Sequence, residues 1–420
     1  MSEWIESSLT QLVTFQKGRK VDSSDFPIHG YATNLGASGI EGRFDGYGEI
    51  RFGITAKATD VLMLWDGERS GLVGFGREGV VGSTVSKLSP EDHIEPKYLY
   101  FSLLHKFDWI QHRRTGTGVP HVPKDIGRML KVQYPKGREV QRKIATILTS
   151  IDTAIEKTEA LIEKYQHIKA GLMHDLFTRG VLPNGQLRPL RDQAPELYQD
   201  TAIGWIPKEW QLVNLGEMAQ IVSGVTLGAK AGPTDTIDAP YLRVANVQDG
   251  YLDLSDIKTV RISAKTLEQL RLVPGDVLMN EGGDFDKLGR GAVWNGEVEN
   301  CVHQNHVFRV RCNAIVLMAH YLAYYSESAF GKKYFVMSAK QSTNLASINS
   351  TQLKAYPIAL PELQEQGAII QHVQRAKNFQ DTLNAEMINL RAQKNGLMQD
   401  LLTGKVAVRV ASESRELLDA

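Results

Sequence analysis

The sequence of 420 residues has little of what marks secreted, membrane or zinc-dependent proteins. It contains only two cysteines, Cys301 and Cys312, which excludes a disulfide scaffold. Because no second cysteine pair accompanies them, the spacing also argues against a structural zinc site. No charged start followed by an apolar stretch occurs, and no apolar run approaches about eighteen residues. We therefore expect no signal peptide and no membrane span. The default expectation is a reducing, cytoplasmic setting.

An excess of charge of either sign is also missing. The chain has 48 basic and 48 acidic residues. Residues 1–138 carry 18 Lys and Arg against 16 Asp and Glu, and residues 201–362 carry 15 against 16. This balance argues against a protein that binds nucleic acid strongly through bulk charge alone. Any nucleic-acid affinity would depend on local clusters and on phosphate contacts supplied by partners.

Catalytic motifs are absent or incomplete. No helicase-type phosphate loop occurs, and the Gly-x-Gly-x-x-Gly match at residues 74–79 continues into residues 80–83 instead of a helix, which favours a Gly-rich hairpin. Residues 238–241 only faintly match the tetrapeptide with which amino-methyltransferases hold a flipped base. His303 to His306 alternate like one face of a strand, and the acidic residues 281–286 lack a nuclease lysine at suitable spacing. We expect neither an enzyme nor a metal site.

A long internal repeat is the main positive feature. Residues 169–181 align with residues 394–406 at an offset of 225, and eight of the thirteen positions are identical. The same offset carries Gln141 onto Gln366. Because this period is far too long for a solenoid, it indicates a duplicated domain.

Each copy of the repeat predicts one long helix with an apolar stripe. Apolar residues recur every 3.5 positions, as in a coiled-coil seam, and no proline interrupts residues 139–179 or 365–405. About forty residues at ~1.5 Å each give roughly 60 Å, and the obvious partner of each helix is its own repeat. Lys169 and Lys394 occupy the same seam position, where a polar pair would fix register. The alternative is that each helix packs on its neighbouring domain. The predicted seam residues are Ile144, Leu148, Ile151, Ile155, Ile162, Leu172, Leu176, Ile369, Val373, Leu383, Met387, Leu390, Leu397 and Leu401.

The remaining sequence forms two compact regions that match only in outline. Strands are predicted over residues 60–64, 71–73 and 79–81, followed by a helix over residues 95–107. Asp276-Val277-Leu278-Met279 repeats the start of the first of these strands. The predicted division is residues 1–138 for the first region, 139–182 for the first helix, 183–206 for an irregular linker, 207–362 for the second region, 363–405 for the second helix and 406–420 for a tail.

This order of regions, together with several short strings, resembles the specificity (S) subunit of type I restriction–modification systems. The strings are Gly-Trp-Ile-Pro-Lys-Glu-Trp at residues 204–210, Tyr-Leu-Arg-Val-Ala-Asn-Val at 241–247, Pro-Glu-Leu-Gln-Glu-Gln at 361–366, and Gly-Leu-Met-x-Asp-Leu near both helix ends. The first region departs from the pattern because no Gly-Trp-Ile-Pro string precedes it and Lys-Gly-Arg at 136–138 replaces the usual Pro-Glu-rich start.

The resemblance implies an α+β fold with two similar α/β target recognition domains, separated by two long antiparallel coiled-coil helices with pseudo-twofold symmetry. Each domain would bind one half of a split, asymmetric site in double-stranded DNA. The helices would set the spacing and dock two methyltransferase (M) subunits, with restriction/translocase (R) subunits joining the complex. S-adenosylmethionine, ATP and Mg are then expected on the partner subunits, and no cofactor or catalytic residue in this chain.

Base-reading side chains are expected to be Arg, Lys, Asn, Gln, His or Thr on loops, because these match the donors and acceptors on base edges. In the first region, the candidates are Arg113, Arg114, Thr117 and His121, followed by Lys17, Arg19, Lys20, Tyr31 and Asn34. In the second, they are Lys340, Gln341 and Asn344, followed by Arg243, Asn246, Lys332 and Lys333.

Two other classes of function stay open at this point. One is a methyltransferase or nuclease with degenerate motifs, which cofactor binding by the purified chain would reveal. The other is a coiled-coil scaffold whose compact domains bind proteins and show no sequence-specific DNA binding.

Overall fold

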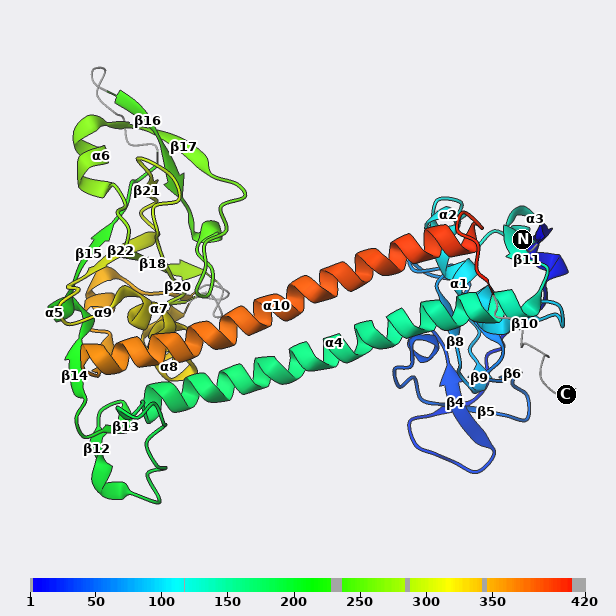
Figure 1. The fold of residues 1–420 in the computed structure, drawn as a ribbon, viewed down its shortest axis with the longest axis horizontal. Helices are drawn as coiled ribbons and strands as arrows, with labels where there is room; N and C mark the ends of the chain where they lie inside the picture. Colours follow the sequence, from blue (N-terminus) through cyan, green and yellow to red (C-terminus); the bar gives the residue numbers. More distant parts are fainter. Residues whose placement is uncertain (1–2, 117, 228–235, 284–287, 342–345, 410–420) are drawn as a thin grey trace, which may run out of the picture. The chain divides into compact units, whose positions relative to one another are not determined.

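The computed structural model describes residues 3–116, 118–227, 236–283, 288–341 and 346–409. The chain divides into two compact units, residues 1–160 with 385–420 and residues 161–384. Each unit contains one of the predicted compact regions, named domain 1 and domain 2 below, and one segment of each long helix (Figure 1). In the described part of the chain, no helix is both long and apolar enough to cross a membrane.

Domain 1 contains two sheets and a terminal strand pair. The four-stranded sheet has the order β2-β10-β7-β8 and consists of β2 (Val13–Lys17), β7 (Val61–Leu64), β8 (Val73–Phe75) and β10 (Val85–Pro90). The five-stranded sheet has the order β3-β5-β4-β9-β6 and consists of β3 (Ser23–Ser24), β4 (Tyr31–Leu35), β5 (Tyr47–Glu49), β6 (Thr55–Ala56) and β9 (Gly79–Val81). Strand β1 (Trp4–Ser8) pairs with β11 (Lys131–Pro135).

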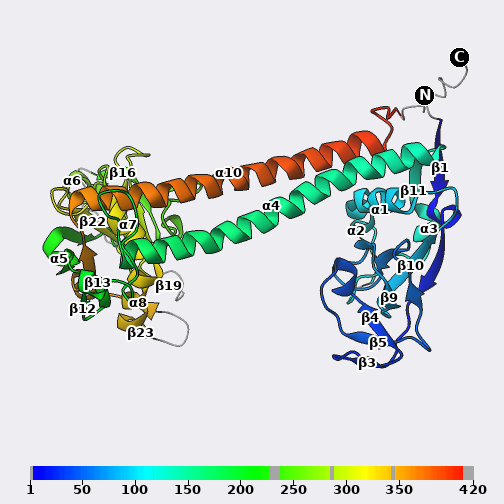
Figure 2. The same cartoon turned by 60° about the horizontal axis from the view of Figure 1, so that its bottom comes forward.

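The helices of domain 1 are α1 (Pro96–His105), α2 (Phe107–Gln111) and α3 (Ile126–Met129). The strands predicted over residues 60–64 and 79–81 and the helix predicted over residues 95–107 are confirmed. The strand predicted over residues 71–73 instead begins at Val73 and ends at Phe75, and strand β11 was missed. The Gly-rich residues 74–79 do not form the predicted hairpin, because β8 and β9 belong to different sheets. Figure 2 shows α1 beside the first turns of the long helix α4, with β3 and β5 at the opposite end of the domain.

Domain 2 repeats this plan. Its four-stranded sheet has the order β15-β22-β18-β20 and consists of β15 (Ala219–Ser223), β18 (Asp276–Asn280), β20 (Gly291–Val293) and β22 (Val307–Cys312). Its second sheet contains β16 (Thr236–Leu242), β17 (Lys258–Ser263) and β21 (Val302–His303), and its terminal pair is β14 (Gln211–Asn214) with β25 (Pro357–Leu360). A small third sheet has the order β19-β24-β23, from β19 (Gly282–Gly283), β23 (Lys340–Gln341) and β24 (Ala346–Ser347). The helices are α5 (Leu215–Met218), α6 (Ala264–Leu270), α7 (Ala319–Glu327), α8 (Ala329–Ser338) and α9 (Ser350–Lys354).

The two domains therefore share one topology, although their sequences match loosely. The four-stranded sheets place their strands in the same chain order, and each second sheet contains one parallel pair, β4 with β9 and β16 with β21. Strands β7 and β18 contain the Val-Leu-Met part of the repeated Asp-Val-Leu-Met string and are buried along their length. Such runs are buried on both faces because helices cover one side of the sheet and the second sheet adjoins the other.

The long helices are α4 (Arg138–Thr178) and α10 (Leu363–Leu402), of 41 and 40 residues. The start of α4 and the end of α10 join the core of domain 1, and the end of α4 and the start of α10 join the core of domain 2. At both ends, predicted seam residues of the two helices share one core with residues of the domain. The residues concerned in domain 1 are Ile144, Leu148, Met398, Leu401 and Leu402, and in domain 2 Met173, Leu176, Phe177, Ile369 and Val373.

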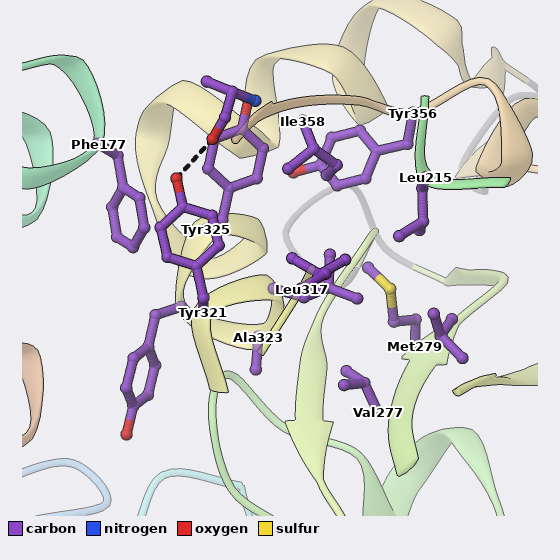
Figure 3. Packing of buried hydrophobic residues seen from close by; sticks show 14 of the residues in the cluster. Phe177, Leu215, Val277, Met279, Leu317, Tyr321, Ala323, Tyr325, Tyr356 and Ile358 are labelled. Atoms are coloured by element: carbon purple, nitrogen blue, oxygen red, sulfur yellow. Dashed lines mark hydrogen bonds between the residues drawn. The ribbon is translucent and has the colours of Figure 1, made fainter. Parts of the chain in front are cut away.

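This arrangement explains the repeated Gly-Leu-Met-x-Asp-Leu string, because in each copy it supplies the apolar residues that close a domain core. In domain 2, the ring centroid of Phe177 lies 5.5 Å from that of Tyr321 and 5.7 Å from that of Tyr325. Figure 3 shows these rings next to Tyr356 and Ile358. The Tyr321 hydroxyl donates a hydrogen bond of 2.6 Å to the carbonyl of Ala359, so this aromatic core is not left with a buried free donor there.

The other predicted seam residues are buried or half-buried. Leu383 and Met387 are 4% and 6% exposed. Those that are half-buried are Ile151, Ile155, Ile162, Leu172, Leu390 and Leu397. Of these, Leu172 packs against the core of domain 2 and Leu397 against that of domain 1, so the alternative of packing on a domain holds for the helix ends.

The seam lysines do not pair with each other. In the first unit, Lys394 lies 2.6 Å from Asp152 across the two helices. In the second unit, Lys169 and Lys377 both contact Glu327 of α7, at 2.8 and 3.2 Å. With the repeat offset of 225, Lys377 occupies the position of Asp152, and Lys394 occupies that of Lys169. The same two helix positions therefore face each other in each unit. In the second unit both positions are lysines, and the carboxylate of Glu327 contacts both ammonium groups.

The predicted linker is more ordered than expected. Residues 195–207 form a short 3₁₀ turn and the hairpin β12 (Tyr198–Thr201) with β13 (Gly204–Pro207). The segment is attached to α10 through Glu365, which accepts hydrogen bonds from the backbone of Val181, the indole of Trp210 and the guanidinium of Arg188. Burial opposes the charge of Arg188, but hydrogen bonds to Glu365 and Glu209 raise its pKa above the ordinary value.

Candidate nucleic-acid interface

Three loops meet at one edge of domain 1. The backbone N–H of Trp65, which follows β7, donates to the carbonyl of Thr84 at 2.7 Å, and the N–H of Val122 donates to the carbonyl of Trp65 at 2.9 Å. The N–H of Gly67 donates to the carbonyl of Pro120 at 2.8 Å. These bonds hold together residues 65–72, 82–84 and the described parts of 112–121, which we call the loop edge of domain 1.

Domain 2 builds the same edge. The N–H of Glu281, which follows β18, donates to the carbonyl of His306 at 3.0 Å, and the N–H of Ile348 donates to the carbonyl of Glu281 at 2.8 Å. The loop edge of domain 2 thus comprises the described parts of residues 281–290, 304–306 and 338–347.

Three predicted or neighbouring polar groups converge at the loop edge of domain 1. Lys17, at the end of β2, places Nζ 2.7 Å from Oδ2 of Asp66, and His121 places Nδ1 2.8 Å from Oδ1 of the same carboxylate. The Lys17 ammonium also lies 5.7 Å from the ring centroid of Trp65. Burial alone would raise the pKa of Asp66, but hydrogen bonds from Lys17 and His121 hold it below the ordinary value. The carboxylate is therefore ionised at neutral pH.

The other first-ranked candidates of domain 1 differ in availability. Arg113 is exposed and stacks on Trp109, with its guanidinium carbon 4.0 Å from the ring centroid. Arg114 donates to the backbone carbonyls of Gln111 and Glu68, so its guanidinium supports the loop. Thr117 lies outside the described residues.

The secondary candidates of domain 1 divide in the same way. Arg19 and Lys20 are exposed and follow Lys17 directly. Tyr31 and Asn34 lie on β4 of the second sheet, half-buried. The Asn34 amide donates to the carbonyl of Asp45 at 3.1 Å, which assigns it to the packing of that sheet.

In domain 2, Lys340 and Gln341 form strand β23, and Asn344 lies outside the described residues. Lys332 of α8 lies 2.9 Å from Asp249, and its neighbour Lys333 is exposed.

Arg243 and Asn246 do not fit the predicted reading role. Asn246 is 3% exposed, accepts from the backbone of Arg243 and donates to the carbonyls of Asp253 and Asp256. Arg243 donates to the carbonyl and carboxylate of Asp256. The Arg-Val-Ala-Asn string at residues 243–246 therefore stabilises a turn, because the Asn246 amide and the Arg243 guanidinium make local hydrogen bonds.

Sequence reasoning did not identify Asp66, Glu281 or His306 as part of these loop edges. His306 places Nδ1 2.5 Å from Oε2 of Glu281, and its side chain is 57% exposed. Sequence reasoning assigned His306 to a strand face and Glu281 to an acidic loop. Their pairing depends on which loops the fold brings together, across 25 residues of chain for this pair and 55 for His121 with Asp66.

Metal and phosphate sites receive no support at these edges. Among the described residues, no group of three or more His, Cys, Asp or Glu side chains is placed to hold a metal ion. His303, which precedes the loop edge in β21, is fully buried and bonds through Nδ1 to the carbonyl of Val307 at 2.6 Å. Asp284 and Asp286 lie outside the described residues.

Comparison with known proteins shows which family this chain is similar to. The family profile described as the type I restriction modification DNA specificity domain matches residues 1–164 and 207–390. The specificity subunit of the type I restriction enzyme MjaVIII from Methanocaldococcus jannaschii is 27% identical over 417 residues, covering 97% of this chain and 94% of that protein. The specificity subunit of the type I restriction enzyme StySPI from Salmonella potsdam is 23% identical, covering 80% of this chain and 71% of that protein.

A solved structure shows the same fold. The S subunit of the type I restriction–modification system from M. genitalium has a TM-score of 0.56 at 15% identity, and the alignment covers 96% of each chain. Together with the two profile matches, which span both domains, this establishes the relationship that the helix repeat indicated. The chain belongs to the type I restriction–modification DNA specificity family.

Proposed function

We propose that this chain is the DNA sequence-specificity subunit of a type I restriction–modification complex, in which each domain reads one half of a bipartite, asymmetric target. The two loop edges are the surfaces proposed to contact base edges. The observation that carries the proposal is that the two loop edges share their backbone hydrogen bonds but differ in their side chains. Both edges use the same backbone hydrogen bonds after β7 and β18, yet one presents Lys17, Asp66 and His121 and the other Glu281 and His306.

This contrast suits direct readout. Phosphate contacts and backbone geometry position a protein on DNA, whereas the side chains at base edges set the sequence that is read. Two domains with one frame and different side chains can therefore present themselves to DNA in the same way and read different sequences. A scaffold that binds two like protein partners would have no need for this divergence.

The long helices are proposed to set the spacing of the half-sites and to dock the methyltransferase subunits. Their repeated sequence supports two like docking surfaces, and hence two M subunits, with R subunits completing the complex. Continuous helices of 41 and 40 residues suit a fixed spacing, because a flexible tether would allow many. S-adenosylmethionine, ATP and Mg are assigned to the partner subunits, and this chain is proposed to be non-catalytic.

Methylome sequencing of a host that expresses this chain with its methyltransferase tests the proposal. The expected result is a methylated motif with two defined half-sites separated by a gap of unspecified bases. Methylation without sequence preference, or at one uninterrupted motif, would contradict two-domain reading. A complex that forms normally but directs no sequence-dependent methylation would favour the scaffold alternative.

A further inference from the structure

The His121 ring has a defined hydrogen-bonding polarity. An ionised carboxylate only accepts hydrogen bonds, so Asp66 requires the proton of the neutral ring to lie on Nδ1. Nε2 of the neutral ring is then a hydrogen-bond acceptor. Lys17 bonds the other carboxylate oxygen and keeps Asp66 oriented for this contact.

Nε2 of His121 is open to a ligand. The side chain is 45% exposed, and among the described residues no hydrogen-bond partner of Nε2 is found. The backbone of Gly116 passes close to the ring, where a Cβ would lie 3.1 Å from Cδ2 and 3.5 Å from Nε2. Gly116 also has φ of +104°, which side-chain-bearing residues rarely adopt. A glycine at this point leaves the acceptor uncovered.

Domain 2 also pairs a histidine Nδ1 with a carboxylate oxygen, but at positions that do not correspond to His121 and Asp66. His306 corresponds in the backbone hydrogen bonds to Thr84, not to His121, and Glu281 corresponds to Trp65, not to Asp66. Even so, its Nδ1 meets a carboxylate oxygen and its ring is exposed. The two loop edges thus arrive at one arrangement with non-equivalent residues, which a purely structural role inherited through the duplication would not explain.

We propose that Asp66 is a positioning residue for sequence reading. It fixes the tautomer of His121 so that Nε2 accepts a hydrogen bond from the exocyclic amino group of an adenine or cytosine in the major groove. Glu281 does the same for His306 in the other half-site. This inference rests on the proposed function, because it assigns a ligand to the loop edge that the function requires.

The hydrogen-bonding role of Nε2 determines which bases this contact prefers. Adenine and cytosine present an amino donor in the major groove, whereas guanine and thymine present a carbonyl acceptor in the corresponding place. A neutral ring with Nε2 as acceptor therefore prefers adenine or cytosine at one position, by about tenfold or more. Protonation turns Nε2 into a donor and reverses the preference. The charged groups that contact this cluster are Asp66 from the turn after β7 and Lys17 from β2, with Arg114 held by backbone carbonyls at the base of the loop.

Asp66→Asn tests the assignment. Because Lys17 is a donor, it holds the amide oxygen, so the amide NH₂ faces His121 and forces its proton onto Nε2. Binding is measured at pH 8 with the subunit assembled with its methyltransferase, using duplexes randomised across both half-sites. The expected result is a switch at one base position of one half-site, from adenine or cytosine to guanine or thymine. Asp66→Glu keeps the preference, as does the matched control Asp92→Asn, an exposed acid of the same domain.

Unchanged base preference in the folded Asp66→Asn complex would overturn the inference, and so would a switch that Asp92→Asn produces as well. Loss of all sequence preference by the unmodified complex at pH 8 would instead refute the proposed function.

Discussion

Gln141 and Gln366 make the same three hydrogen bonds in the two domains. Gln141 accepts from the N–H of Glu95 and donates to the carbonyls of His93 and Pro135. Gln366 accepts from the N–H of Met318 and donates to the carbonyls of Val316 and Pro361. Both side chains are fully buried. Each attaches the first turns of a long helix to the loop before α1 or α7.

Substitution Gln141→Ala or Gln366→Ala should lower the free energy of unfolding by about 2–4 kcal/mol, because it removes the partner of three backbone groups, one of which lies in a buried hydrogen bond. Denaturant unfolding of the purified chain measures the loss. Gln399→Ala, at an exposed position of α10, is the matched control and should change stability by less than about 0.5 kcal/mol. Equal effects for the buried and exposed glutamines would contradict the assigned role.

His303 predicts a pH dependence at the residue scale. Burial lowers the pKa of this side chain to about 4, so the folded state holds it neutral, whereas in the unfolded chain it titrates near 6.5. Between these values, the unfolded state binds more protons, so stability falls as pH decreases from about 6.5 to about 4 and is unaffected by this group above that window. Unfolding across this range should be steeper with pH for the unmodified chain than for His303→Asn. Parallel profiles would contradict the assignment.

At the scale of elements, the same two facing positions of the helix pair are neutralised differently in the two units. Asp152 and Lys394 form a direct ion pair in the first unit. In the second unit, the equivalent positions are both lysines, and Glu327, with a side chain 10% exposed, contacts both. Two facing lysines without an acid would repel each other in a partly buried place.

Glu327→Gln should therefore destabilise the second unit by about 1–3 kcal/mol, less than a fully buried pair would lose because the lysines are partly exposed. Adding Lys377→Asp to this variant recreates the direct pairing of the first unit and should recover most of the loss. Unfolding free energies of the single and double variants measure both effects. No recovery in the double variant would show that the two units do not share the same register.

The elements also show how far the sequence leads. The helix repeat, the strands 60–64 and 79–81 and the helix 95–107 follow from local patterns, since apolar period and turn residues are properties of neighbouring positions. The same periodicity could not show that Ile144 and Leu176 pack into domain cores, because an apolar stripe is indifferent to what covers it. Nor could local patterns bring Asp66 to His121 or join Trp4, at the start of β1, with Gly404 beyond α10, which lies against its ring. These contacts depend on the fold as a whole.

At the scale of the whole molecule, helix length should determine the gap between half-sites. Inserting four residues into α4 after Ala160, and four into α10 after Asn384, leaves the contacts within each unit untouched. The added helix is about 6 Å long, which corresponds to roughly one or two base pairs of duplex. Methylome sequencing should show a longer gap with both half-sites unchanged. The matched control exchanges four exposed residues at the same places without changing length, and should leave the gap as it was.

The most direct test of the account is the methylated motif of a chain altered in one domain only. Arg113→Ala combined with His121→Ala removes two exposed polar groups from the loop edge of domain 1 and leaves domain 2 untouched. The account predicts that one half-site loses definition at one or two positions, while the other half-site and the gap stay the same. Loss of definition in both half-sites, or an unchanged motif, would contradict the claim that each domain reads its own half.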